Sequence, residues 1–438
     1  MNPQPEREAS TGSAAPRVSS GYSNYVLGVL FVVYVFNFID RQVLSILLDD
    51  IKQDIGVSDT YMGFLSGFAF VIFYTFAGIP IAHLADRTSR RTIIALGLTV
   101  WTLMTAASGL ARNALELVLA RIGVGVGEAA GSPPAHSLLS DYFPPERRAT
   151  ALSIYATGVY VGVMIAYLGG GYISEHFGWR SVYITIGLAG IPLALLVRLS
   201  VRELPRGYSE STPVEVETVP FLDALRFLVK CRSLVWIVLA SSIQSLSGYA
   251  FLVWGPAFLG RVHEMGRVDI GIWLGLIVGI AGSGGAYLGG RLTDRFGARD
   301  KRWYMRLPAI QSVCGVPFVI AFVLLESQLA ALMCFIPFYL LGAMYVGPMI
   351  STTQSLVRPS MRATTSAILL FVLNMIGLGL GPLIVGYLND RWSDHFGIEA
   401  IRYSLLLVGI LGGLAGPLFW QASRSLREDL RAVQTRGG

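Results

Sequence analysis

The fold is decided by two similar octapeptides, LADRTSRR at residues 84–91 and LTDRFGAR at residues 292–299. Each copy follows a long apolar stretch, and the two Asp-Arg pairs lie 208 positions apart. A second short repeat, Arg-Ala-Thr, begins at Arg148 and again at Arg362, 214 positions later. Two repeats with nearly the same separation indicate that the chain is built from two similar halves.

The composition places both halves in a membrane. Hydrophobic residues make up 53% of the 438 residues and charged residues only 14%, whereas a soluble protein carries about 25% charged residues. A membrane helix needs about 20 mostly apolar residues. Twelve such stretches lie at 25–48, 61–84, 92–111, 115–139, 149–173, 181–199, 234–259, 270–290, 306–325, 329–352, 364–387 and 402–421. The sequence therefore predicts an all-α membrane protein with two pseudo-symmetric six-helix bundles.

The distribution of Lys and Arg fixes the orientation. With both termini in the cytoplasm, the cytoplasmic segments hold 25 of the 34 basic residues and the outer segments hold seven, as the positive-inside rule requires. We therefore expect both termini to be cytoplasmic. The predicted organisation is a disordered tail at 1–20, a first bundle at 21–200, a linker at 201–232 with an amphipathic interfacial helix, a second bundle at 233–423 and a tail at 424–438.

The repeated octapeptide resembles a motif of the major facilitator superfamily. In that motif a glycine precedes Asp-Arg, and a second glycine precedes a basic pair. This sequence has Gly78 in the first position and Ser89 in place of the second glycine, while the second copy keeps Gly297. The resemblance implies a transporter with alternating access. It also implies a cytoplasmic latch, which we define as Asp86, Arg87, Arg90, Arg91, Asp294 and Arg295; the simpler interpretation is that these charges only anchor helix ends.

Two acids and two arginines fall well inside the predicted spans: Asp40, Arg41, Arg121 and Glu128. A charge in a span costs about 2.5–3.5 kcal/mol on insertion scales, so such residues are usually paired, exposed to a cavity and functional. Arg121 and Glu128 are seven positions apart, which places them on one helix face about 10 Å apart along the axis. The alternative interpretation is a structural salt bridge that holds the first and fourth spans together.

A narrower resemblance involves the same residues. Asn37 and the stretch FIDRQV at 38–43 are similar to the Asn-x-x-Asp-Arg region of the Spinster family, and the run from Arg121 to Glu128 followed by Ala129 is similar too. The family transports lysolipids or sphingolipids, in some members with protons. The resemblance implies that Asp40, Arg41, Arg121 and Glu128 form the site for the substrate head group and for proton coupling.

The second half offers aromatic and neutral polar residues in place of charges. We expect Gln244, Tyr249, Tyr339 and Asn374, together with Asn37 from the first half, to line the cavity. One charged wall and one apolar wall suit an amphipathic anion, because arginine recognises phosphate in a bidentate way. Burial raises the pKa of a carboxylate and a nearby arginine lowers it. A carboxylate that changes partners would therefore load and release a proton, and we expect Asp40 and Glu128 to do so.

The sequence also allows other functions. The chain could carry or export small organic anions or drugs, or act as a membrane receptor or sensor. No nucleophile–base constellation or metal-ligand spacing points to an enzyme, a cofactor or a metal. We expect the partners to be a lipid-like substrate, protons and membrane lipids, without nucleic acid, and the protein to be a monomer. Short loops without an Asn-x-Ser/Thr site suit a bacterial inner membrane.

Overall fold

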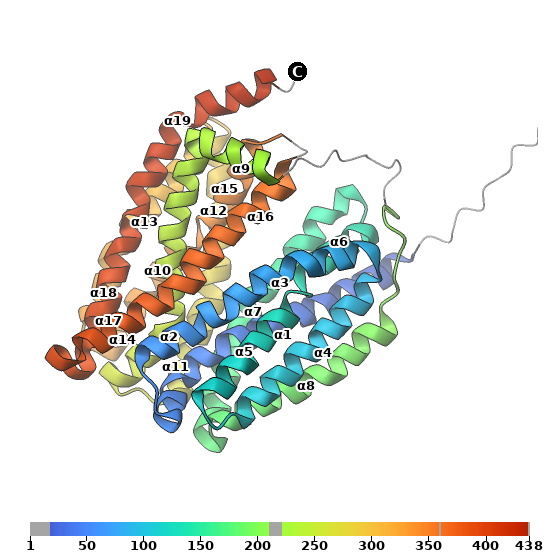
Figure 1. Cartoon of the computed structure of the whole chain (residues 1–438). Helices are drawn as coiled ribbons and strands as arrows, with labels where there is room; N and C mark the ends of the chain where they lie inside the picture. The colour runs from blue at the N-terminus through green and yellow to red at the C-terminus, as the bar shows by residue number, and fades with distance from the viewer. Residues whose placement is uncertain (1–17, 210–220, 359–360, 437–438) are drawn as a thin grey trace, which may run out of the picture.

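The computed structural model describes residues 18–209, 221–358 and 361–436, and within these ranges it contains helices and no β-strand. Figure 1 shows two helical bundles, one formed by the blue-to-green first half and the other by the yellow-green-to-red second half. Of the predicted tail at 1–20, only positions 18–20 are among the described residues. Of the predicted linker at 201–232, the described residues are 201–209 and 221–232.

The first bundle is formed by α1 to α8. Their bounds are α1 Ser20–Ile55, α2 Asp59–Ser66, α3 Phe68–Arg87, α4 Arg90–Leu110, α5 Ala114–Glu128, α6 Ser132–Tyr142, α7 Pro145–Phe177 and α8 Trp179–Ser200. The second span is divided into α2 and α3 at Gly67, where an added Cβ would collide with the Leu378 carbonyl of the other half. Glycine at this position therefore lets the two bundles approach closely.

The fourth predicted span, 115–139, is not one helix. It is divided into α5, which ends at Glu128, and α6, which begins at Ser132. Pro133 and Pro134 open α6, and prolines have no backbone N–H with which to continue the hydrogen bonds of a preceding helix. The break places Glu128 at the end of a helix rather than in the middle of one.

The second bundle follows α9, Phe221–Lys230, which occupies the region of the predicted interfacial helix. Its elements are α10 Arg232–His263, α11 Arg267–Leu276, η1 Ile277–Gly282, α12 Ser283–Gly297, α13 Trp303–Leu324, α14 Gln328–Ala343, α15 Val346–Ser355, α16 Arg362–Leu373, η3 Asn374–Leu380, α17 Gly381–Phe396, η4 Gly397–Glu399, α18 Ala400–Gly413 and α19 Ala415–Arg436. The segments η1 and η3 are π-helical, a form that often marks functional sites.

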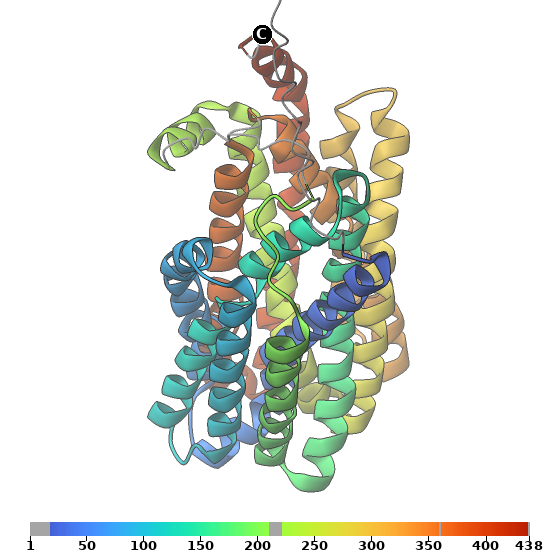
Figure 2. The ribbon, with the colours of Figure 1, turned by 90° about the vertical axis from the view of Figure 1, so that its right-hand side faces the viewer.

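Ten helical runs of the described residues are long and apolar enough to cross a membrane. The last run, Thr364–Val433, contains the two final predicted spans, and the divided fourth span is not among the ten. Helices thus occupy all twelve predicted stretches. The final helix α19 continues to Arg436, well past the predicted end at 421, and projects beyond its bundle in Figure 2.

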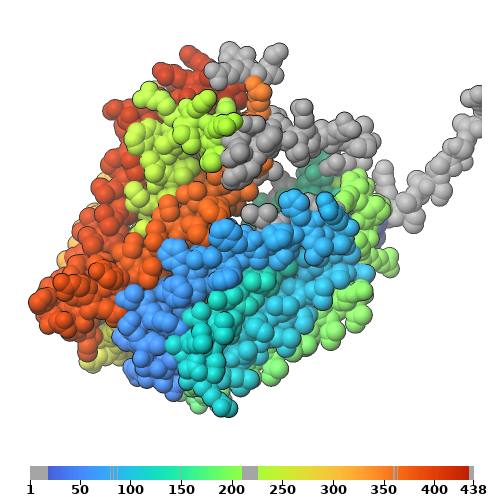
Figure 3. Space-filling model, in the orientation of Figure 1, coloured from blue at the N-terminus to red at the C-terminus, as the bar shows by residue number. Residues whose placement is uncertain are grey.

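The two bundles are joined at the end predicted to face outward. Arg261 of α10 donates to Asp49 of α1 at 2.5 Å and to Asp59 of α2 at 2.5 Å. Asp390 of α17 accepts from the backbone N–H of Thr60 at 2.7 Å. In the space-filling view the blue and orange surfaces of the two halves meet at this end (Figure 3). We call Arg261, Asp49 and Asp59 the outer gate.

Candidate functional site: a charged pair facing a central cavity

Arg41 and Glu128 form an ion pair between α1 and α5. The Nε of Arg41 donates to Oε2 of Glu128 at 2.5 Å. The Glu128 side chain is fully buried, and its second oxygen, Oε1, has no hydrogen-bond partner. Arg41 is therefore the counter-charge that allows an ionised Glu128 to lie inside the bundle, since an unpaired buried charge is very costly.

Asp40 and Arg121 form a second pair between the same two helices. Nη1 of Arg121 lies 3.3 Å from Oδ1 of Asp40, and the hydroxyl of Thr105 on α4 donates to the same carboxylate. Both charged side chains are 1% exposed. The structure thus brings all four predicted residues together, but it encloses this second pair within the first bundle.

Aromatic rings surround the guanidinium of Arg41. It lies over the ring of Tyr74 at 4.5 Å, over that of Phe70 at 4.8 Å and over that of Phe38 at 5.2 Å. A guanidinium within about 6 Å of a ring centroid gains cation–π attraction, and more so away from water. These rings hold Arg41 in place beside its partner Glu128.

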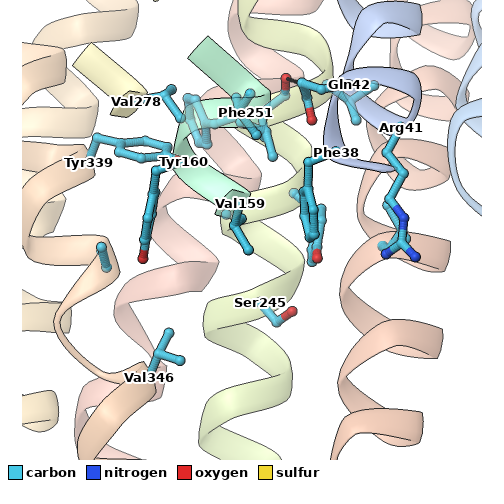
Figure 4. Close-up of a pocket in the computed structure, with 18 of the residues that line it drawn as sticks. Phe38, Arg41, Gln42, Val159, Tyr160, Ser245, Phe251, Val278, Tyr339 and Val346 are labelled. Carbon is cyan, nitrogen blue, oxygen red and sulfur yellow. Dashed lines mark hydrogen bonds between the residues drawn. The ribbon is translucent and has the colours of Figure 1, made fainter. Parts of the chain in front are cut away.

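A cavity of about 230 Å³ lies between the bundles beside this pair. Among the described residues that line it, Arg41 is the only charged one. Figure 4 shows Arg41 on one side and the rings of Tyr160 and Tyr339 on the other. Apolar side chains such as Val278 and Val346 complete the wall. The cavity is therefore asymmetric, with a cation on one side and apolar and aromatic groups on the other.

The cavity's lining overlaps the predicted one in part. Gln244, Tyr249 and Tyr339 line it, whereas its lining includes neither Asn37, which is buried on α1, nor Asn374 of η3. Periodicity alone does not tell which face of a polar span meets the other bundle, and both asparagines lie on faces outside this cavity.

Gln42, which is not among the predicted site residues, lines the cavity and connects the halves. Its Nε2 donates to the backbone carbonyl of Leu252 on α10 at 2.8 Å and to the hydroxyl of Tyr167 at 2.9 Å. An amide beside two charges within an apolar span was the available signal, because polar side chains there are usually functional.

The predicted latch residues of the first half bind within that half. Arg90 is buried and donates to Glu203 at 2.8 Å, to Asp141 and to the carbonyl of Leu204. Arg91 donates through its backbone N–H to Glu203 at 2.9 Å. This network attaches the start of the linker to α4 and α6.

The remaining latch residues are more exposed or outside the description. Arg87 and Arg295 are exposed, and Asp294 accepts from the hydroxyl of Tyr304 at 3.1 Å. The side chain of Asp86 lies outside the described residues. A latch between the halves therefore stays a prediction about another conformation.

The outer gate was not predicted as a site. From the sequence alone Arg261 is one of the seven outer basic residues, and nothing in the sequence singles out Asp49 or Asp59. Lys52 adds a further pair, with its Nζ at 2.6 Å from Asp59. Pairing between residues about 200 positions apart has no local sequence signal, so only the packed bundles reveal it.

Within the described part of the chain, no group of three or more His, Cys, Asp or Glu residues could hold a metal.

The chain is similar to known transporters along nearly its whole length. The family model described as Major Facilitator Superfamily matches residues 30–382. An MFS-type efflux pump of Mycolicibacterium smegmatis is 34% identical over 407 residues, which cover 92% of this chain and 93% of the pump. Human protein spinster homolog 1 is 27% identical over 449 residues, which cover 95% of this chain and 84% of the human protein.

A solved structure shares the architecture. It is the crystal structure of a bacterial homologue of the human lysosomal transporter Spinster, in an inward-facing and unoccupied conformation. The TM-score is 0.85 and the identity 30%, with 94% of this chain and 99% of that chain covered. The chain therefore belongs to the Major Facilitator Superfamily, in which it is a Spinster-like, multi-pass membrane transporter and not an enzyme.

Proposed function

We propose that this transporter moves an amphipathic anion of the lysophospholipid or sphingolipid type, coupled to protons, by alternating access. The observation that carries the proposal is the position of Arg41, which is the only charged residue among the described ones that line the cavity between the bundles. Such a wall attracts a phosphate or carboxylate, and the aromatic wall opposite accepts the apolar part of the same molecule.

The head group would bind to Arg41 rather than to Arg121. Arg121 is 1% exposed and paired with Asp40, whereas the Arg41 side chain is 15% exposed. Glu128 accepts only the Nε–H of Arg41, and among the described residues no carboxylate engages the terminal Nη groups. Those groups supply the paired donors that phosphate and carboxylate accept.

Proton coupling follows from the competition between two anions for Arg41. A bound head group weakens the pairing of Arg41 with Glu128, and a buried carboxylate without its counter-charge is costly. Glu128 then takes up a proton. Anion and proton therefore bind together at this site, and release of one favours release of the other. Asp40, with Thr105 and Arg121 as partners, is the second acid that can change its protonation.

The size of the cavity supports a head-group site. At about 230 Å³ it is smaller than typical small-molecule sites of about 300–1,000 Å³. It therefore suits a head group and the first part of a chain, while the rest of the chain would lie between the bundles toward the lipid. Most of the lining is apolar or aromatic, and Arg41 is the one charged group among the described residues that form it, which favours an amphipathic anion over a small anion that is polar on every side.

A second candidate is the export of planar aromatic drugs. It is favoured by the aromatic lining and by the similarity to the efflux pump. Reconstituted vesicles with an imposed pH gradient separate the candidates when three probes are compared: oleoyl-lysophosphatidylglycerol, glucarate and ethidium. We expect gradient-driven movement of the lysolipid alone. Movement of ethidium or glucarate without the lysolipid contradicts the proposal, and no flux of any probe favours a receptor.

A further inference from the structure

A second cavity lies at the predicted cytoplasmic end of the second bundle. It has a volume of about 530 Å³, within the range of about 300–1,000 Å³ that is typical of ligand sites. It lies among the loop after α12, the start of α13 and α16, the end of α15 and the middle of α19. Figure 1 shows these helices reaching the upper end of that bundle.

Its lining is strongly basic. Five cationic side chains and one acidic side chain surround it. The cations are Arg299, Lys301, Arg362, Arg427 and Arg431, and the acid is Asp300. A concave surface with this excess of positive charge raises the local concentration of anions.

Asp300 does not cancel this charge. Its carboxylate accepts from Nε of Arg302 at 3.0 Å and lies 3.0 Å from Nη2 of Arg427 and 3.6 Å from Nη1 of Arg306. Three arginines thus share one acid. Arg427 is one of the five cations that line the cavity, whereas Arg302 and Arg306 are additional to them. Asp300 holds Arg427 against the cavity rather than neutralising the site.

Thr352 supplies an independent indication of a binding site. Its side chain lines this cavity, is 3% exposed, and has a hydroxyl oxygen without any hydrogen-bond partner. Buried hydroxyls are normally satisfied, and an orphan costs about 1–3 kcal/mol. Ser355 in the next turn, by contrast, donates to the carbonyl of Ser351 at 2.8 Å. A ligand that accepts a hydrogen bond would satisfy Thr352.

The cavity also has an apolar side and lies near the membrane surface. Leu426 and Leu430 of α19 line it. Trp420, 42% exposed on the same helix, lies 5.5 Å from the guanidinium of Arg306. Exposed tryptophans are typical of the membrane interface, so the basic cavity lies at the depth of lipid head groups.

We propose that this cavity binds a phosphate group at a site separate from the transport site, with Arg299, Lys301 and Thr352 as ligands. The phosphate comes either from the head group of an anionic membrane lipid or from a soluble phosphate. Because the cavity joins α13, α15, α16 and α19, an occupied site stabilises the inner end of the second bundle.

The test uses the full-length protein in a neutral detergent. Thermal unfolding is followed during titration with phosphatidylglycerol, phosphatidylcholine or inorganic phosphate. We expect saturable stabilisation by phosphatidylglycerol or by inorganic phosphate in the wild type. In R299Q/K301Q the apparent Kd rises at least about tenfold, the effect of losing a charge-assisted hydrogen bond, and in T352V it rises about fivefold.

The matched control is R291Q/R424Q, which removes two exposed charges outside the cavity. It should bind as the wild type does. Stabilisation by phosphatidylglycerol alone identifies a lipid source, and stabilisation by inorganic phosphate identifies a soluble one. The proposal is overturned when neither ligand stabilises the wild type, when phosphatidylcholine does so equally well, or when the control weakens binding as much as R299Q/K301Q. If R299Q/K301Q does not fold, the apparent Kd of T352V provides the test instead, because this variant keeps the size of the side chain.

Discussion

Arg41 and Glu128 are joined at 2.5 Å, yet they lie in different surroundings: the arginine borders the central cavity, and the glutamate behind it is fully buried. An anion that enters the cavity therefore contacts Arg41 directly and influences Glu128 only through its effect on Arg41. This arrangement makes the binding of anion and proton depend on each other, and it leads to the predictions below.

The affinity for an anionic lysolipid should increase as the pH falls. Protonation of Glu128 removes the competitor for Arg41, so oleoyl-lysophosphatidylglycerol should bind about tenfold more tightly at pH 5.5 than at pH 7.5, an effect of about 1.4 kcal/mol. Titration by thermal shift at the two pH values measures this change. Glu128→Gln should bind at both pH values as the wild type binds at pH 5.5. A wild type that binds more tightly at pH 7.5 would contradict this competition.

Arg41→Lys should weaken lysolipid binding although the charge is kept. Lysine lacks the planar fork that binds phosphate through two parallel hydrogen bonds. We expect about thirtyfold weaker binding, or about 2 kcal/mol, the size of one charge-assisted hydrogen bond. Isothermal titration with oleoyl-lysophosphatidylglycerol measures the loss.

The control for Arg41 is Arg112→Lys, an exchange of an exposed arginine at the predicted outer surface. It should leave the affinity unchanged. If Arg41→Lys folds poorly because lysine is an unsuitable partner for Glu128, the double variant Arg41→Gln with Glu128→Gln replaces it in the test, since it removes both charges together. Full lysolipid affinity in that double variant would exclude Arg41 as the head-group ligand.

Removal of the outer gate should open the outer side. Arg261 holds Asp49 and Asp59 across the two bundles, and a partly buried pair that loses one partner costs about 3–5 kcal/mol. In a variant without native cysteines that carries Ala257→Cys, we expect Arg261→Ala to increase the rate of labelling by a membrane-impermeant maleimide at least about tenfold. Ala257 lines a further cavity, distinct from the central one, together with the gate residues Asp49 and Arg261.

Arg180→Ala is the matched control for the gate. It breaks the pair of Arg180 with Asp54, which is also at the outer end but lies within the first bundle. The labelling rate should stay at the background value. Equal acceleration by both variants would show that the gate residues do not specifically keep the bundles closed.

Attachment of the linker should depend on pH through Glu203. Burial acts to raise the pKa of Glu203, but hydrogen bonds from the Arg91 backbone, Arg90 and Ser89 outweigh it, so the pKa lies below its ordinary value. The stabilisation is therefore complete above the ordinary pKa and is lost as the pH falls through the lower pKa of the folded state.

Thermal unfolding of the wild type and of Glu203→Gln tests this dependence. The melting temperature of the variant should be lower at pH 7, and the difference should shrink steadily toward pH 3. Glu146→Gln, which changes an exposed acid in the first turn of α7, serves as the control. A difference that grows as the pH falls would contradict the assigned direction.

The fold was predictable because membrane spans and repeats leave strong local signals. Apolar stretches of about 20 residues, basic loops and two octapeptides are enough to specify paired bundles. The break after Glu128 was harder to see, although Gly131 and the two prolines that follow were present in the sequence. Their effect competes with a run of apolar residues that reads as one continuous helix.

The site was predictable in its members but not in its geometry. Charges inside spans single out Asp40, Arg41, Arg121 and Glu128, but spacing does not tell which arginine pairs with which acid or which one faces the cavity. That choice depends on how α1 is rotated against α5 and α10. The outer gate depends on contacts between the two bundles in the same way, so it has no local signal.

The central proposal rests on Glu128 as the acid that couples protons to transport. The most direct test is lysolipid movement driven by a pH gradient in proteoliposomes, with Glu128→Gln compared with the wild type and with Glu428→Gln, an exposed acid on α19. We predict that Glu128→Gln loses gradient-driven accumulation but retains exchange of lysolipid across the membrane, while Glu428→Gln behaves as the wild type does. Full gradient-driven accumulation in Glu128→Gln would contradict the role assigned to Glu128.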